Sequence, residues 1–219
     1  MRRFWRDNGL SVVLLTTFLV CLAGQSVAGH RFHNAEQRDH GRPEISYTDY
    51  LASPEFLSAT AENWESEFLQ MGMFVVLTVF LYQRGSAESK DPDRREEVDR
   101  EPDPTRPGAP AAVRRGGLAL ALYRQSLSVA FLALFVVSLV LHAVGGSGQY
   151  NEEQAEHGGA ERVTPLAYMG TSRFWFESLQ NWQSEFLAIA SMVLLTIGLR
   201  QQGSPESKPV HAPHTETGH

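Results

Sequence analysis

Apolar and polar positions fall in long separate blocks along the 219-residue chain. A bilayer core of about 30 Å needs about 20 helical residues, and two of the four apolar blocks have nearly that length. The other two have fifteen and fourteen residues, but apolar side chains at helical spacing precede them, which extends the predicted helices to about 54–83 and 172–201. The pattern therefore predicts four membrane spans, at about residues 10–28, 64–83, 124–144 and 182–201.

The chain also repeats itself. Residues 63–90 and 181–208 are identical at sixteen of 28 positions, and the polar segment NAEQRDHG at 34–41 recurs as NEEQAEHG at 151–158. Each copy contains two predicted spans, an even number, so both copies enter the membrane in the same orientation. The predicted fold is an all-α integral membrane protein: a four-helix transmembrane bundle made of two tandem helical-hairpin repeats in parallel orientation.

The hairpin repeats occupy residues 1–86 and 118–203, and two polar segments follow them. Residues 87–117 are rich in Asp, Glu, Arg, Pro and Gly, and residues 204–219 have a similar composition. Segments with so few large apolar side chains cannot bury a core, so we expect a disordered linker and a disordered tail.

The distribution of Lys and Arg predicts the orientation. Fourteen of the nineteen lie in the N-terminal segment, the loop 83–126 and the C-terminal tail, and five lie in the other two loops. Basic loops stay in the cytoplasm, so both termini and the linker should be cytoplasmic. The first apolar block also has features of a signal peptide, with Arg2 and Arg3 before it and Ser26-Val-Ala28 at its end, so cleavage stays an alternative.

Overall composition excludes several classes of protein. The single cysteine, Cys21, rules out an internal disulfide framework and a cysteine-based zinc cluster. A formal net charge of −6 without a basic domain argues against nucleic-acid binding. Nucleophile elbows, phosphate loops and catalytic triads are missing, so the sequence does not indicate an enzyme.

Two motifs occur once in each repeat, Asn-Trp-x-Ser-Glu-Phe-Leu at 63–69 and 181–187, and Gln-x-Gly-Ser-x-Glu-Ser-Lys at 83–90 and 201–208. With these motifs the chain resembles a bacterial family of small four-span membrane proteins that is known only as a domain of unknown function. The resemblance covers nearly all of the chain except the linker and tail. It implies a bacterial inner-membrane protein and no activity, cofactor or site.

The first motif supplies a candidate polar site. Glu67 and Glu185 stand where the apolar runs begin, each four residues after an asparagine, so that Asn63 and Asn181 share their helix faces. Ionisable residues at membrane depth usually face the bundle interior, where the two carboxylates could share a proton or bind a cation. The alternative is a hydrated position in the headgroup region. Membrane-interface anchors are the expected role of two tryptophans in the same motifs, Trp64 and Trp182.

The polar segments 34–41 and 151–158 supply a candidate metal site. Glu36 and His40 are four residues apart, as are Glu153 and His157, so on a helix each pair shares a face. Two imidazoles and two carboxylates suit zinc or another divalent ion. The alternative is a short loop helix that Gly41 and Gly158 terminate as left-handed caps.

The second motif is predicted to end a helix. Gly85 and Gly203 fit the position just after a helix C-terminus, and Ser86 and Ser204 can cap a following turn. The motif's lysines, Lys90 and Lys208, could instead bind a lipid headgroup or a partner.

Three functions remain from sequence alone. The first is a structural or envelope-associated membrane protein in contact with the lipid bilayer, possible as a homo-oligomer. The second is a small transporter or channel that uses Glu67 and Glu185. The third is a metal-binding envelope protein or enzyme that uses Glu36, His40, Glu153 and His157; no other cofactor is expected.

Overall fold

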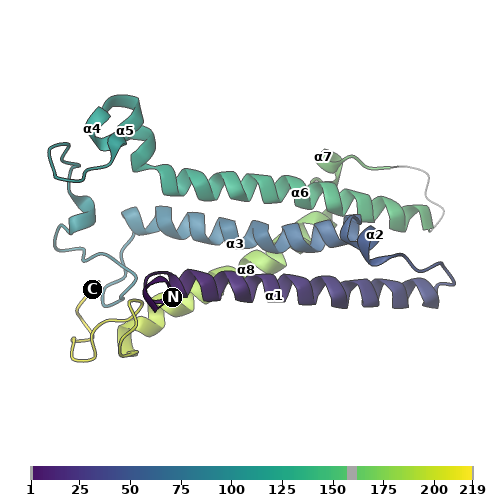
Figure 1. The fold of residues 1–219 in the computed structure, drawn as a ribbon, viewed down its shortest axis with the longest axis horizontal. Helices are drawn as coiled ribbons and strands as arrows, with labels where there is room; N and C mark the ends of the chain where they lie inside the picture. The colour runs from purple at the N-terminus through teal and green to yellow at the C-terminus, as the bar shows by residue number, and fades with distance from the viewer. Residues whose placement is uncertain (1, 157–161, 219) are drawn as a thin grey trace. The chain divides into compact units, whose positions relative to one another are not determined.

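The computed structural model describes residues 2–156 and 162–218, and these residues form helices and turns without a strand. Four helices are long, namely α1 (Arg2–Asp39), α3 (Pro54–Phe80), α6 (Ser126–Glu156) and α8 (Ser172–Gly198) (Figure 1). The shorter elements are α2 (Tyr47–Leu51), the 3-10 helix η1 (Glu97–Asp99), α4 (Ala111–Arg115), α5 (Gly117–Arg124) and α7 (Pro165–Tyr168). The all-α prediction is confirmed for the described residues.

Two of the long helices have the length and apolar composition of a membrane span, α1 over Arg2–Asp39 and α6 over Ser126–Ala155. The apolar parts of α3 and α8 are shorter, since each begins only after the Ser-Glu pair of its motif. Two candidate spans are thus supported, and the four-span bundle stays a prediction.

The described chain divides into two compact units. The first comprises Met1–Thr60 and Leu141–Tyr168, and the second comprises Ala61–Val140 and Met169–His219. The helices α3 and α6 each contribute to both units.

In the first unit, an asparagine near the end of each of two long helices, α1 and α6, holds the chain that follows the helix. The Asn34 side chain accepts from the backbone N–H of Ile45 (2.9 Å) and donates to the Ile45 carbonyl (3.0 Å). Asn151 makes the same two bonds to Val163, at 2.8 and 3.0 Å. Each asparagine amide therefore pairs with a peptide group eleven or twelve residues downstream and ties the returning chain to its helix.

A buried tyrosine follows each asparagine clamp. Tyr50 lies against Gly29, and Tyr168 lies against Gly146, so closely that a Cβ on either glycine would overlap the tyrosine ring or hydroxyl. Burial raises the pKa of the Tyr50 phenol, and the charge of Glu55 raises it further. The glycines leave the space that the tyrosine rings fill.

Matching hydroxyl caps start the helices α3 and α8. The Ser53 Oγ accepts from the Phe56 N–H, and the Thr171 Oγ1 accepts from the Phe174 N–H, both at 3.2 Å. A hydroxyl cap of this kind satisfies one of the N–H groups that a helix start leaves without an intrahelical partner.

The end of α1 explains the polar segment 34–41. Gly41 has φ +68°, its N–H donates to the Arg38 carbonyl (2.9 Å), and the next N–H, of Arg42, donates to the Gln37 carbonyl (2.8 Å). The left-handed cap predicted at Gly41 is confirmed. The segment forms the last turns of α1 rather than a separate loop helix.

The predicted ends of α3 and α8 need correction. These helices end at Phe80 and Gly198, so Gly85 and Gly203 do not occupy the C-cap region. Both glycines instead have positive φ (+86° and +84°) inside a later turn. The predicted serine caps are confirmed, because Ser86 and Ser204 accept the N–H of the glutamate two residues on, at 3.1 and 3.2 Å.

Candidate functional site

A polar cluster joins α3 and α8 within the second unit, and its centre is a carboxylate that the sequence did not single out. Glu65 is fully buried and accepts from the Trp182 indole N–H at 3.1 Å. Gln70, one helical turn further along α3, donates to the Glu185 carbonyl at 2.6 Å. The Glu65–Trp182 bond ties the first motif of one repeat to the first motif of the other, and the Gln70 bond is made by the residue that follows the motif.

The two candidate asparagines have different surroundings. Asn181 is half-buried and donates to the Glu62 carboxylate and to the Glu177 carbonyl (3.2 Å). Asn63 is exposed. The sequence match therefore places the asparagines on equivalent helix turns that differ in burial.

The two candidate carboxylates are brought near each other. Glu67 is exposed and Glu185 is half-buried, and their charges are close enough to interact. Whether this pair holds a proton or a cation stays a prediction.

The tryptophans of the first motif are both half-buried. Trp182 packs edge-on against Phe135 and Trp175, with ring centroids 6.4 and 6.2 Å apart, in addition to its bond to Glu65. Its indole thus contacts protein on several sides. The role of Trp64 and Trp182 as membrane-interface anchors stays a prediction.

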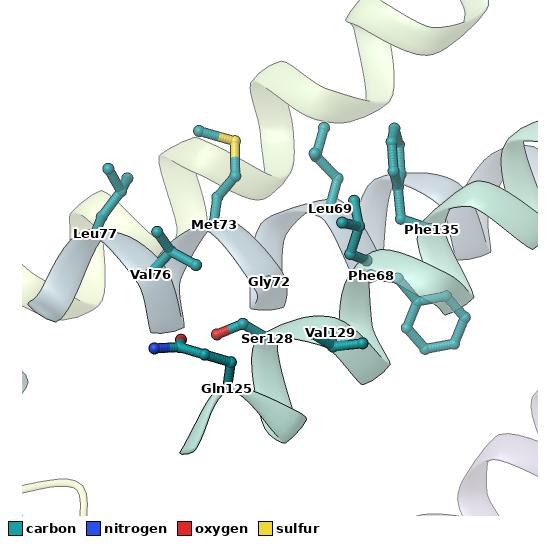
Figure 2. Close-up of a pocket in the computed structure, with 11 residues that line it drawn as sticks. Phe68, Leu69, Gly72, Met73, Val76, Leu77, Gln125, Ser128, Val129 and Phe135 are labelled. Carbon is teal, nitrogen blue, oxygen red and sulfur yellow. The ribbon is translucent and has the colours of Figure 1, made fainter. Parts of the chain in front are cut away.

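An apolar groove of about 330 Å³ runs between α3 and α6, beside this cluster (Figure 2). Gln125 and Ser128 lie near one end, and Phe68 and Phe135 lie toward the other (Figure 2). The remaining lining residues are Leu69, Gly72, Met73, Val76, Leu77, Val129 and Leu132. No sequence motif pointed to this groove, because its walls are ordinary apolar positions of two helices.

Three of the four predicted metal ligands, Glu36, His40 and Glu153, line one cavity of about 280 Å³ in the first unit. The same cavity contains His33, whose Nδ1 lies 2.5 Å from a Glu55 carboxylate oxygen. The fourth predicted ligand, His157, lies outside the described residues. Among the residues that are described, no group of three His, Cys, Asp or Glu side chains has the geometry to hold a metal ion.

The lysines of the second motif have unlike partners. The Lys90 Nζ pairs with Asp99 at 2.7 Å, and the hydrogen bond that it donates, followed by one from the Glu96 N–H, lowers the pKa of the Asp99 carboxyl. Lys208 is almost fully buried and donates to four backbone carbonyls. Burial, and then the charge of Arg200, lowers the pKa of the Lys208 ammonium.

The carbonyls around Lys208 belong to two segments. One is that of Gly85 in the first repeat, and the others are those of Pro213, His214 and Glu216 in the tail. The ammonium therefore holds the tail against the glycine turn of the first repeat. Disorder of the linker 87–117 and of the tail 204–219 stays a prediction.

These observations define the class of protein: over the described residues the chain is all-helical, and two of the helices in that part are long and apolar enough to cross a membrane. The whole length, residues 1–219, matches the family model described as Domain of unknown function (DUF6766), and the chain belongs to this family. No curated protein and no solved structure matches the chain. An uncharacterised family agrees with the resemblance found in the sequence.

Sequence reasoning missed Glu65 for a specific reason. Residues retained in both repeats were taken as candidates, and the second repeat has Gln183 at the matching position. A usable signal was present, because Glu65 lies four residues after Ala61, one of the small and apolar residues at helical spacing before the apolar run.

Proposed function

We propose that the chain is an integral protein of the bacterial inner membrane, structural or envelope-associated, with four spans and both termini in the cytoplasm. The observation that carries the proposal is the distribution of polarity on the long helices, which is the reverse of the one expected for a protein surrounded by water. Large apolar side chains are exposed on all four of them, whereas many of the buried side chains are small and polar.

The exposed side chains include one example on each long helix: Val20 (66%), Phe80 (70%), Val137 (56%) and Leu194 (58%). Buried hydroxyl groups include those of Ser26, Ser58, Thr60, Ser66, Ser138, Ser147, Ser178 and Thr196. Water disfavours such extended apolar faces. In a bilayer the same faces contact lipid, and small or hydroxyl-bearing residues between helices suit membrane packing.

The lengths of α3 and α8 support four spans rather than two. Each has 27 residues, which is about 40 Å at about 1.5 Å per residue, longer than a bilayer core of about 30 Å. The polar first turns of each helix then extend beyond the membrane on its outer side. The duplicated clamps at Asn34 and Asn151 support a parallel repeat, because both would lie on that outer side.

Thiol labelling tests this topology. In a Cys21→Ser background, single cysteines replace Pro43 in the first outer loop, Leu166 on α7 and Thr105 in the linker, all exposed positions. An impermeant maleimide should label the first two in intact spheroplasts and the third only after lysis. Labelling of Pro43→Cys and Leu166→Cys from opposite sides would overturn the parallel repeat, and release of the protein by alkaline carbonate would overturn membrane integration.

A small transporter or channel is the second candidate, because both repeats place a glutamate, Glu67 and Glu185, where the apolar run of the helix begins. Solute flux in reconstituted vesicles that is lost in the double variant Glu67→Gln, Glu185→Gln would favour it over a structural role. Flux that survives in the double variant would remove this pair from the pathway.

A metal-binding envelope protein is the third candidate, because Glu36, His40 and Glu153 line one cavity. Elemental mass spectrometry of the purified protein tests it. Stoichiometric metal in the wild type that is lost in His40→Ala, His157→Ala supports this role, and equal metal content in both proteins contradicts it.

A further inference from the structure

A short helical elbow, α4 and α5 (Ala111–Arg124), precedes α6 (Figure 1). Leu118 and Leu122 are four residues apart on α5 and are 83% and 70% exposed, and Tyr123 beside them is also exposed. Eight residues cannot cross a bilayer, yet an exposed apolar face on so short a helix suits the boundary between headgroups and acyl chains.

The charges around the elbow have one sign. Asp103 is the last acidic residue before Glu152, and every charged residue between them is an arginine: Arg106, Arg114, Arg115 and Arg124. Arg124 pairs with Glu101, but that carboxylate is 88% exposed. An exposed ion pair contributes only about 0–1 kcal/mol, so a phosphate can replace the carboxylate.

The apolar groove between α3 and α6 begins one residue after Arg124. The wall on the α6 side runs from Gln125, the residue before α6, to Phe135, which is about 15 Å at about 1.5 Å per residue. One leaflet is half of a hydrocarbon core of about 30 Å, so the groove has the length of a single leaflet. Its polar end is formed by Gln125 and Ser128 (Figure 2), and Gln125 directly follows Arg124 of the elbow in the sequence.

We propose that elbow and groove together form a binding site for one anionic phospholipid of the cytoplasmic leaflet. The arginines at positions 114, 115 and 124 bind the phosphate, and one acyl chain lies along the groove. This inference rests on the proposed function, because the elbow meets that leaflet only if the linker is cytoplasmic.

A second copy of the chain fits this face less well than a lipid. Symmetric dimers use the same patch on both partners. A dimer through the elbow and groove would bring two arginine-only elbows together, and like charges repel. A phosphate supplies the opposite charge, and an acyl chain supplies an apolar occupant of the right length.

The site occurs once per chain. In the first repeat no elbow interrupts the helix, since α1 continues from Arg2 to Asp39. The groove also depends on Gly72, which the second repeat replaces with Ala190. A Cβ at Gly72 would lie 3.2 Å from the Phe131 Cβ, so a larger residue there would push α3 and α6 apart. One bound lipid per chain is therefore expected.

Native mass spectrometry of the full chain in detergent tests the proposal, with dioleoyl phosphatidylglycerol and dioleoyl phosphatidylcholine as probes. One anionic lipid should saturate first, at lower concentration than the zwitterionic one. Each arginine near a lipid surface contributes about fivefold in binding, so Arg114→Gln, Arg115→Gln, Arg124→Gln should lower the anionic affinity about a hundredfold. The matched control changes Arg94, Arg95 and Arg100, which lie among acidic residues.

The groove is tested separately. Val129 lines it and is 53% exposed, so Val129→Trp fills the groove from the outside and should weaken binding of both lipids. Val137→Trp is the control, at a similarly exposed position of α6 away from the groove.

Three results overturn the proposal: equal affinity for the two lipids, equal binding by the two tryptophan variants, or a dimer that Val129→Trp dissociates while lipid binding is unchanged. Thiol labelling of the same proteins separates the two levels of inference. If topology holds and the lipid preference is absent, only the lipid site fails. If topology fails, the proposed function fails with it.

Discussion

The asparagine clamps allow the same perturbation to be made twice in one protein. Asn34→Ala removes two bonds to the Ile45 peptide, and Asn151→Ala removes two bonds to the Val163 peptide. A typical intramolecular hydrogen bond contributes about 0.5–1.5 kcal/mol net, so each variant should lose about 1–3 kcal/mol of local stability. Asn34 is buried, and its side-chain nitrogen also lies 2.9 Å from the His30 imidazole, so the loss in Asn34→Ala should be near the upper end of this range.

Hydrogen exchange read by mass spectrometry measures this loss where it occurs. A factor of ten corresponds to about 1.4 kcal/mol, so the peptide containing Ile45 should exchange about 5–150 times faster in Asn34→Ala. The peptide containing Val163 should respond in the same way to Asn151→Ala. Asn8→Ala is the matched control, because this exposed α1 asparagine bonds only within its own helix, to the Phe4 carbonyl.

Unchanged exchange at Ile45 in Asn34→Ala would refute the clamp. A response of the same size in Asn8→Ala would show that loss of any α1 asparagine loosens the helix, and the two bonds would then explain nothing. A response at Ile45 without its counterpart at Val163 would contradict the equivalence of the two outer loops.

Three further variants or conditions have defined outcomes. Gly29→Ala and Gly146→Ala crowd the buried tyrosines and should lower the free energy of unfolding by about 1–3 kcal/mol, measured by thermal shift. At the control position Gly24 a Cβ meets no atom within 4 Å, so the stability of Gly24→Ala should stay within about 0.5 kcal/mol of wild type. Lys208→Met removes a charged donor from four carbonyls and should lower the stability of the docked tail by about 1.5–3 kcal/mol. Faster proteolysis after residue 203 would report this loss, and the control variant Lys90→Met should not show it. Because the folded-state pKa of Asp99 is lowered, the stability that it contributes is present above the ordinary Asp value of about 4 and is lost as pH falls through the lowered pKa. Protection factors in residues 90–99, which divide out the slower intrinsic exchange at low pH, should therefore fall on acidification, and Lys90→Met should flatten that dependence.

Hydrophobic periodicity predicted the long helices well, because exposed apolar runs and their i, i+3, i+4 extensions are local properties of the chain. It failed at the helix ends. Leu81 follows Phe80 as an apolar residue, so nothing in the polarity pattern marks the end of α3 there. The elbow was missed for a similar reason: α5 is apolar enough to merge with the next run, and only the backbone break at Gln125 separates it from α6.

The candidate site was less predictable than the fold, and the duplicated motifs show why. Bonds within a motif recur in both copies: the Gln83 N–H donates to Ser89, and the Gln201 N–H donates to Ser207, both at 2.9 Å.

Bonds that leave the motif differ, because they depend on what the following segment brings. Lys90 meets the carboxylate of Asp99 in the linker, whereas Lys208 meets only backbone carbonyls. The same holds for the buried Glu65, whose Trp182 partner lies 117 residues away. A sequence repeat therefore predicts local geometry in both copies, while the different contacts of the two copies arise from residues that the repeat does not share.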